Sequence, residues 1–259
     1  MSIFNSDDPL SKFLFILCIL IGFIVIMNIS VSLLSMVLVN TKPYLIKGMV
    51  PGNVPVVIQQ DPSISGAIPV MRSDNKSGIE FSWSVWLNIT DVGNVDGQYQ
   101  HIFHKGEQNI SSDTGLNVPL NAPGLYVSPK TNELTVVMNT FDVINEEVVI
   151  PNFPMNKWAN VIIRVMNNNI LDVYVNGSLA RRHVLSSLPR QNYGNVYVAS
   201  NGGFTGNLSN LQYFTYAVQP GEIVSITNRG PSLTTSKSSS SLNAEPPYLS
   251  LHWYTDNLS

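Results

Sequence analysis

Charged residues are scarce in this 259-residue chain. Asp, Glu, Lys and Arg make up 12% of it, against roughly 25% in ordinary globular proteins. The 14 basic and 17 acidic residues give a net charge of −3 and are scattered. Because phosphate binding needs a concentrated lysine or arginine face, this composition excludes a nucleic-acid-binding protein. The 44% hydrophobic content favours a membrane segment together with an uncharged β-rich domain.

Cysteine is almost absent. The single residue of this type, Cys18, lies inside the apolar N-terminal stretch. The remainder of the chain therefore has no disulfide, no thiolate nucleophile and no thiolate metal site.

Sequence patterns for catalysis are also missing. Glycoside hydrolysis needs two carboxylates that face each other, whereas the adjacent pair Glu146 and Glu147 would point to opposite faces of a strand. His101 and His104, three apart, are likewise expected on opposite faces, which argues against a metal site. No G-x-S-x-G nucleophile elbow occurs, although a Ser-His-Asp triad assembled by the fold stays open. We expect a non-enzymatic protein with no catalytic residue, no metal ligand and no cofactor.

An uncharged apolar run covers residues 13–39. As a helix it is about 40 Å long, which exceeds the ~30 Å hydrocarbon core of a bilayer. A signal peptide cleaved near Ser30 is the alternative, but its apolar region would be shorter. An uncleaved transmembrane anchor is therefore predicted. Lys42 and Lys47 follow the run while Lys12 precedes it, which weakly favours a cytoplasmic C-terminal domain.

Three small polar residues fall on one face of this predicted helix, at Asn28, Ser32 and Ser35. Such a face can hydrogen-bond to a partner helix in the bilayer. The alternative is that a single-pass helix simply tolerates them.

Changes in composition divide the chain into six parts. The residues before the apolar run form a tip (1–12), and proline at high density predicts a stiff spacer over 40–65. From 66 to 230, period-2 strands alternate with Asn, Gly and Pro turns, which predicts an all-β two-sheet sandwich. Within 81–88, for example, Phe81, Trp83 and Val85 are expected on one face and Trp86 on the other. A Ser/Thr linker (231–243) and an aromatic tail (244–259) complete the chain.

Four segments in order give the sandwich its resemblance to the concanavalin A-like jelly roll, specifically the laminin-G-like branch. The third, a Trp-led strand, an Asn turn and a strand that ends in Tyr-Val-Asn-Gly, is the most specific. The resemblance implies a fold that hosts lectins, hydrolases and adhesion modules alike. The four segments are 81–88 followed by 101–106, then 124–139, 156–182 and 203–226.

The resemblance also implies a rim where relatives often bind calcium through a closing acidic block. Here that block, 206–210, reads Gly-Asn-Leu-Ser-Asn and lacks the carboxylates that a hard cation needs. Calcium-dependent sugar binding is therefore doubtful. Glycan binding without calcium stays open, because Asn-rich loops lie near aromatic residues that offer stacking faces; these are Tyr193, Tyr197, Phe204, Tyr213 and Tyr216.

The tail ends in an aromatic and aliphatic group that is unusual for a frayed terminus. Either it folds back on the sandwich or it docks on another protein. The residues are Tyr248, Leu249, Leu251, Trp253 and Tyr254.

The favoured function is a membrane-anchored interaction or scaffold protein, whose partners are the lipid bilayer and other proteins. The assembly resembles membrane-associated minor structural proteins of large DNA viruses, which implies a link between an internal virion membrane and the capsid. The alternative is a lumenal or extracellular lectin-like adhesion module that binds glycans. That alternative would make use of glycosylation sequons such as those at Asn109 and Asn176.

Overall fold

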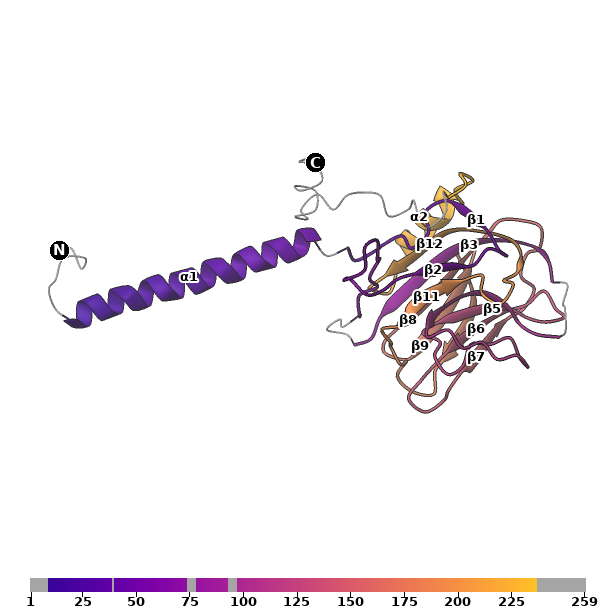
Figure 1. Cartoon of the computed structure of the whole chain (residues 1–259), viewed down its shortest axis with the longest axis horizontal. Coiled ribbons are helices and arrows are strands. Elements are labelled where there is room, and N and C mark those ends of the chain that lie inside the picture. Colours follow the sequence, from indigo (N-terminus) through magenta and orange to yellow (C-terminus); the bar gives the residue numbers. More distant parts are fainter. Residues whose placement is uncertain (1–8, 39, 74–77, 93–96, 237–259) are drawn as a thin grey trace. The chain divides into compact units, whose positions relative to one another are not determined.

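The computed structural model describes residues 9–38, 40–73, 78–92 and 97–236. The chain divides into an N-terminal unit that ends at Asn40 and a second unit that begins at Thr41. Figure 1 shows a single long helix in the first unit and two β-sheets in the second.

The N-terminal helix, α1, spans Pro9–Leu38. Its segment Pro9–Ser30 is long and apolar enough to cross a membrane, and it has no burial within the chain. At 1.5 Å per residue this segment is about 33 Å long, close to the thickness of a bilayer core. The helix begins before residue 13 because proline suits a first turn and Lys12 does not interrupt helical backbone. An anchor and a signal sequence share these properties.

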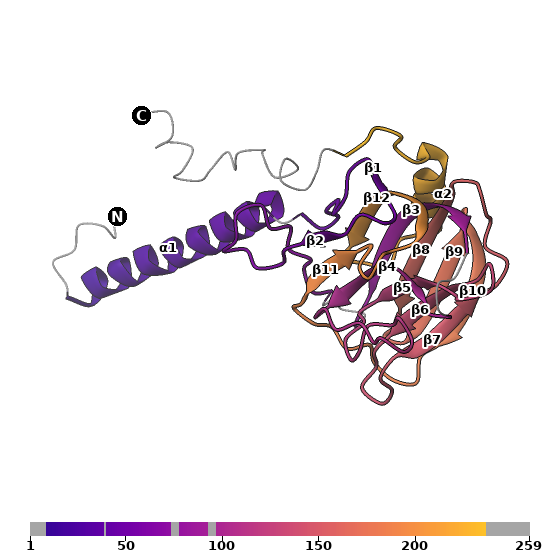
Figure 2. The ribbon, with the colours of Figure 1, turned by 45° about the vertical axis from the view of Figure 1, so that its right-hand side comes forward.

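The second unit is a sandwich of two six-stranded antiparallel sheets, which confirms the predicted fold class. Figure 2 shows the strands of both sheets. Sheet A has the order β1-β12-β3-β8-β9-β10, and sheet B has the order β2-β11-β4-β5-β6-β7. The strands are β1 Met49–Pro51, β2 Val56–Ile58, β3 Phe81–Asp91, β4 Gln100–Gly106, β5 Gly124–Val127, β6 Leu134–Met138, β7 Glu146–Ile150, β8 Ala159–Met166, β9 Ile170–Val175, β10 Ser178–Val184, β11 Asn195–Val198 and β12 Thr205–Phe214.

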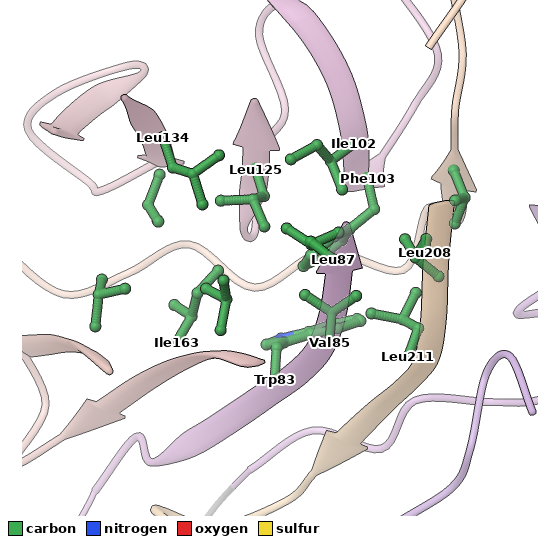
Figure 3. Packing of buried hydrophobic residues seen from close by; sticks show 14 of the residues in the cluster. Trp83, Val85, Leu87, Ile102, Phe103, Leu125, Leu134, Ile163, Leu208 and Leu211 are labelled. Atoms are coloured by element: carbon green, nitrogen blue, oxygen red, sulfur yellow. The ribbon is translucent and has the colours of Figure 1, made fainter. Parts of the chain in front are cut away.

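Alternation along the strands places one face of each sheet in the core. Trp83 and Val85 of β3 point between the sheets toward Phe103 and Leu125 of sheet B (Figure 3). The indole of Trp83 stacks on the ring of Phe103 with centroids 5.3 Å apart. Trp86 lies on the opposite face of β3, as its position in the alternation predicted.

A short helix covers the outer face of sheet A. This helix, α2 (Pro220–Arg229), begins with proline and carries Glu222 in its first turn, the signals from which a helix was expected here. Ile223 and Ile226 of α2 pack on Ile162 and Phe214 of the sheet.

The proline-rich segment is not a spacer over its whole length. Leu45 and Ile46 are buried in the core, β1 pairs with β12 and β2 pairs with β11. The segment fits because three-residue edge strands tolerate proline, whose missing N–H would otherwise be needed in the ladder. The start of the predicted linker also joins the sheet, since the Ser236 N–H donates to the Met49 carbonyl.

Candidate binding site

Part of the outer face of sheet B is covered. The segment 107–123 lies over it, and Leu116 packs on Tyr126 and Val137, which point outward from the sheet. Amide side chains hold the segment in place: the Tyr126 hydroxyl donates to Asn121 Oδ1 (2.7 Å), and Asn121 Nδ2 donates to the Asn117 carbonyl (2.6 Å). Burial of these polar groups is tolerated because each has a partner. The segment therefore covers the middle of this face, while Val57 of β2 and Val149 of β7 stay exposed.

Two histidines lie beneath this covering segment. His101 and His104 are both buried on the outer face of β4, and their rings meet edge to face. The expectation that they point to opposite faces was wrong. A β-bulge at Ile102 adds one residue between them, so Ile102 and Phe103 both face the core while both histidines face outward.

An open cleft of about 410 Å³ lies at the rim of the sandwich. Three segments that are distant in sequence form its wall: the β1–β2 turn with Asn53, the residues that lead into β4 with Tyr99, and the β11–β12 turn with Asn201. Asn53 and Asn201 are exposed and Tyr99 is half-buried. Amides that can donate and accept, beside an aromatic ring, are groups that suit a neutral polyhydroxylated ligand.

Close backbone contact between two turns shapes this cleft. The Phe204 N–H donates to the Gly52 carbonyl (2.9 Å), and the Gly52 N–H donates to the Gly206 carbonyl (2.8 Å). Gly203 lies at φ 63°, and a Cβ there would be 1.9 Å from the Gly52 oxygen. Only glycine permits this approach. The shape of the cleft therefore depends on a glycine at position 203.

Tyr99 is the half-buried aromatic residue among those that line the cleft, and it was not singled out from the sequence. Its hydroxyl donates to Glu147 Oε2 (3.3 Å), and its ring meets Tyr126 edge to face. Burial and then the negative charge of Glu147 raise the pKa of Tyr99. Many aromatic residues that precede a strand belong to the core. The sequence therefore does not mark Tyr99 as a cleft residue, and only the fold does.

Most of the aromatic residues expected at a glycan site lie elsewhere in the sandwich or contribute to its packing. Tyr213 is buried in the core, the Tyr216 hydroxyl donates to Glu222, and Tyr197 stacks on His104. Phe204 lines the cleft but is itself buried, and Tyr193 lies at another hollow.

The closing block is used for structural hydrogen bonds. Asn210 Oδ1 accepts from the Gly48 N–H (3.1 Å), and the Ser209 hydroxyl donates to the Ser232 carbonyl (2.8 Å). Among the described residues, no three His, Cys, Asp or Glu side chains gather as metal ligands would.

Glu146 is more than a solvated strand-edge residue. Its carboxylate accepts from the Ser186 hydroxyl (2.7 Å) and lies 2.7 Å from His183 Nε2, so it joins β7 of sheet B to β10 and the residues after it. In a catalytic triad the histidine would lie between the serine and the carboxylate. Here the carboxylate lies between the other two, which is a structural junction.

The other predicted site residues are less informative. Asn28 Nδ2 donates to the Ile24 carbonyl of its own helix (2.9 Å), which satisfies the amide within α1. The side chains of Ser32 and Ser35 lie outside the described residues. The whole aromatic tail also lies outside them, namely Tyr248, Leu249, Leu251, Trp253 and Tyr254.

Comparison with known proteins places the sandwich in a family. The model of the concanavalin A-like lectin/glucanases superfamily matches residues 65–224. No curated protein matches the chain.

Three solved structures have similar folds. Two point mutants of HCR/D superpose with TM-scores of 0.51 and 0.50, at 10% and 11% identity, over 73% and 70% of this chain. They are matched over only 46% and 41% of their own length. The receptor binding domain of botulinum neurotoxin D gives a TM-score of 0.49 at 13% identity, over 73% of this chain and 52% of its own. The chain thus spans about half of each, and the likeness shows the fold alone. None of these comparisons supports the resemblance to viral membrane proteins.

Proposed function

This chain belongs to the concanavalin A-like lectin/glucanases superfamily, and we propose that it is a membrane-anchored, non-enzymatic binding module that holds glycans in its rim cleft. The observation that carries the proposal is the cleft itself, where Asn53, Asn201 and Tyr99 converge from three segments. Amide groups can hydrogen-bond sugar hydroxyls while the tyrosine ring packs against a sugar face. The uncleaved form of α1 supplies the anchor.

Absence of enzymatic activity is part of this proposal. The position of Glu146 supports it, because its carboxylate accepts from the Ser186 hydroxyl and lies 2.7 Å from His183 Nε2. Glu146 and Glu147 are adjacent on β7 and point to opposite sides of the strand, so the two do not form the facing pair that glycoside hydrolysis needs.

The binding test uses the full-length chain in lipid nanodiscs on a panel of immobilised neutral glycans. Asn201→Gly removes one cleft amide and leaves the backbone unstrained, because Asn201 already has φ 51°. Asn152→Gly is the matched control, since Asn152 is exposed, has φ 56° and lies outside the cleft. Binding that is lost in the first variant and kept in the second supports the proposal. Equal binding by both variants contradicts it.

Membrane orientation separates this function from a scaffold inside a virion. A glycan-binding domain faces the lumen or the exterior, whereas the few lysines that flank the apolar run favoured the cytoplasm. The capsid-linking role is supported by composition only. Protease protection of intact microsomes that carry the full-length chain decides: a protected second unit supports the glycan-binding module, and an accessible one favours the scaffold.

A further inference from the structure

Lys105 is a buried cation with no carboxylate beside it. The bulge in β4 turns its side chain inward, and it is only 6% exposed. Its ammonium donates to the carbonyls of Asn192 (2.9 Å) and Gly194 (2.8 Å). No carboxylate in the described part of the chain forms an ion pair with it. Burial of an ammonium without an opposite charge is costly, and one of its three N–H donors is left over.

Two hollows lie beside Lys105. The narrow one, of about 20 Å³, is lined by Trp83, Lys105 and Gln191 among others. The wider one, of about 300 Å³, is open to solvent and is lined by Gln60, Asp61, Lys105 and Tyr193 among others. Lys105 and Val70 belong to both walls. The narrow recess holds a group about the size of one water molecule, and the wider hollow holds several more atoms.

Unsatisfied polar atoms gather at the narrow recess. Within the described residues, the indole Nε1 of Trp83 has no hydrogen-bond partner although Trp83 is 1% exposed. The side-chain Nε2 and Oε1 of Gln191 are also buried and unpartnered. Native structures leave few such atoms unsatisfied. A lysine that only tied down the segment 192–194 would leave the two donors, Trp83 Nε1 and Gln191 Nε2, without an acceptor.

We propose that the recess beside Lys105 is a binding site for a carboxylate, with the body of the ligand in the wider hollow. The ammonium, the indole N–H of Trp83 and the amide N–H of Gln191 are three donors, and a carboxylate has about four acceptor positions. One oxygen fits the narrow recess. Arg72, which also lines the narrow recess, adds a second positive charge that favours an anion. The carboxylate comes either from an acidic sugar or from a free organic acid. This site is separate from the rim cleft.

Three charged groups line the site: Lys105, Asp61 and Arg72, which lines the narrow recess and donates to the Tyr193 hydroxyl (3.4 Å). Burial lowers the pKa of Lys105 to about 8, so carboxylate binding is expected to weaken as the pH rises above about 8 and the ammonium loses its proton. Asp61 lies at the wider hollow, fully exposed, with its carboxylate turned to the Ser63 N–H (2.9 Å) and hydroxyl (2.7 Å). Its negative charge opposes an incoming carboxylate.

The test is calorimetric titration of the full-length chain in nanodiscs with glucuronate, glucose and acetate. Binding of glucuronate but not glucose establishes the need for a carboxylate. Glucuronate that binds more tightly than acetate identifies an acidic sugar as the source, and equal affinities identify a free acid. If neither carboxylate binds, a buried water satisfies these atoms and the proposal is overturned.

Variants locate the binding. Gln191→Met keeps the size of a side chain that makes no hydrogen bond to the described part of the chain and is expected to weaken binding roughly tenfold, as loss of one charge-assisted hydrogen bond predicts. Asp61→Asn is expected to tighten it. Lys105→Met abolishes it but also removes two loop contacts, so Gln191→Met is the variant that decides. Unchanged affinity in Gln191→Met overturns the proposal. A rim variant, Asn201→Gly, leaves carboxylate binding intact, which separates this site from the glycan cleft.

Discussion

His101 Nε2 lies 2.6 Å from His104 Nδ1 on the covered face of sheet B. The Ser200 N–H donates to His101 Nδ1 (3.0 Å), and His104 Nε2 lies 3.3 Å from the Glu107 carbonyl. A carbonyl only accepts, so His104 carries its proton on Nε2 and accepts at Nδ1. His101 accepts from Ser200 at Nδ1 and donates from Nε2. The hydrogen-bond chain runs in one direction only, and it requires both rings to be neutral.

Acid is therefore expected to destabilise the sandwich. Burial lowers the pKa of His104 from 6.5 to about 4, and burial followed by repulsion from His104 lowers the pKa of His101. Between pH 6.5 and 4 the unfolded chain binds these protons and the folded chain does not. The free energy of unfolding then falls with decreasing pH, by about 1.4 kcal/mol per pH unit for each histidine.

Urea unfolding of the full-length chain in detergent between pH 7 and pH 4.5 measures this slope. His104→Gln removes one titrating group and is expected to flatten it by roughly half. A variant whose slope equals that of the parent would show that the pair does not control acid stability.

Gly203→Ala is expected to cost about 3 kcal/mol or more in the free energy of unfolding, because its Cβ would lie 1.9 Å from the Gly52 oxygen. Gly202→Ala is the matched control. Gly202 has φ 80° but nothing within 4 Å of a Cβ, so only the backbone penalty of about 1–2 kcal/mol applies. Chemical denaturation measures both. Equal costs would mean that the contact between the two turns is not tight in solution.

Asp172 organises the outer face of sheet A. It is fully buried and accepts from Arg164 (2.6 Å), itself largely buried, and from Arg182 (2.7 Å), which is half exposed. Burial alone would raise the pKa of Asp172, but the hydrogen bonds from Arg182 and Arg164 outweigh it and lower the pKa. Asp172→Asn leaves Arg164 buried without its countercharge and is expected to cost about 3–5 kcal/mol of unfolding free energy.

Arg182→Met serves as the comparison for that change. Because the Arg182 side chain is half exposed to solvent, its ion pair with Asp172 contributes little. Arg182→Met is expected to lower the free energy of unfolding by no more than about 1 kcal/mol. Thermal and urea unfolding measure how much unfolding free energy each of the two variants loses. If Arg182→Met proves as damaging as Asp172→Asn, the exposed arginine is the main partner of Asp172.

Glycosylation is expected at Asn109 if the second unit enters the lumen, as the proposed function requires. Asn109 is exposed on the segment that covers sheet B, and its sequon is Asn-Ile-Ser. Expression in mammalian microsomes should give a mobility shift that a deglycosidase removes, and Asn109→Gln should reduce this shift by one glycan. A full-length chain with no shift at all contradicts lumenal placement.

Local pattern determined much of the architecture. The alternation of Phe81, Trp83 and Val85 places these side chains in the core without reference to any other strand, because successive residues of a strand face opposite sides. The uncharged run from residue 13 determined an apolar helix, and the Pro, Gly and Glu before residue 223 determined the start of α2. These features depend on neighbours in sequence.

Short and polar strands were harder to predict. The three residues of β1 include Pro51 and look like loop, and β10 is polar and exposed along almost its whole length. Each becomes a strand because a neighbouring strand offers free hydrogen-bonding groups at the edge of the sheet. Hydrophobic pattern carries no signal for such pairing.

The sites were decided by tertiary structure alone. A one-residue bulge against β5 joins His101 to His104 and turns Lys105 inward, and a bulge is a property of two paired strands rather than one. Asn53, Tyr99 and Asn201 meet only because β1, β4 and the β11–β12 turn end at the same rim. The sequence by itself determined a sandwich behind an apolar helix, since periodicity reports which side of a strand is buried. Which polar groups meet was left to the register between strands.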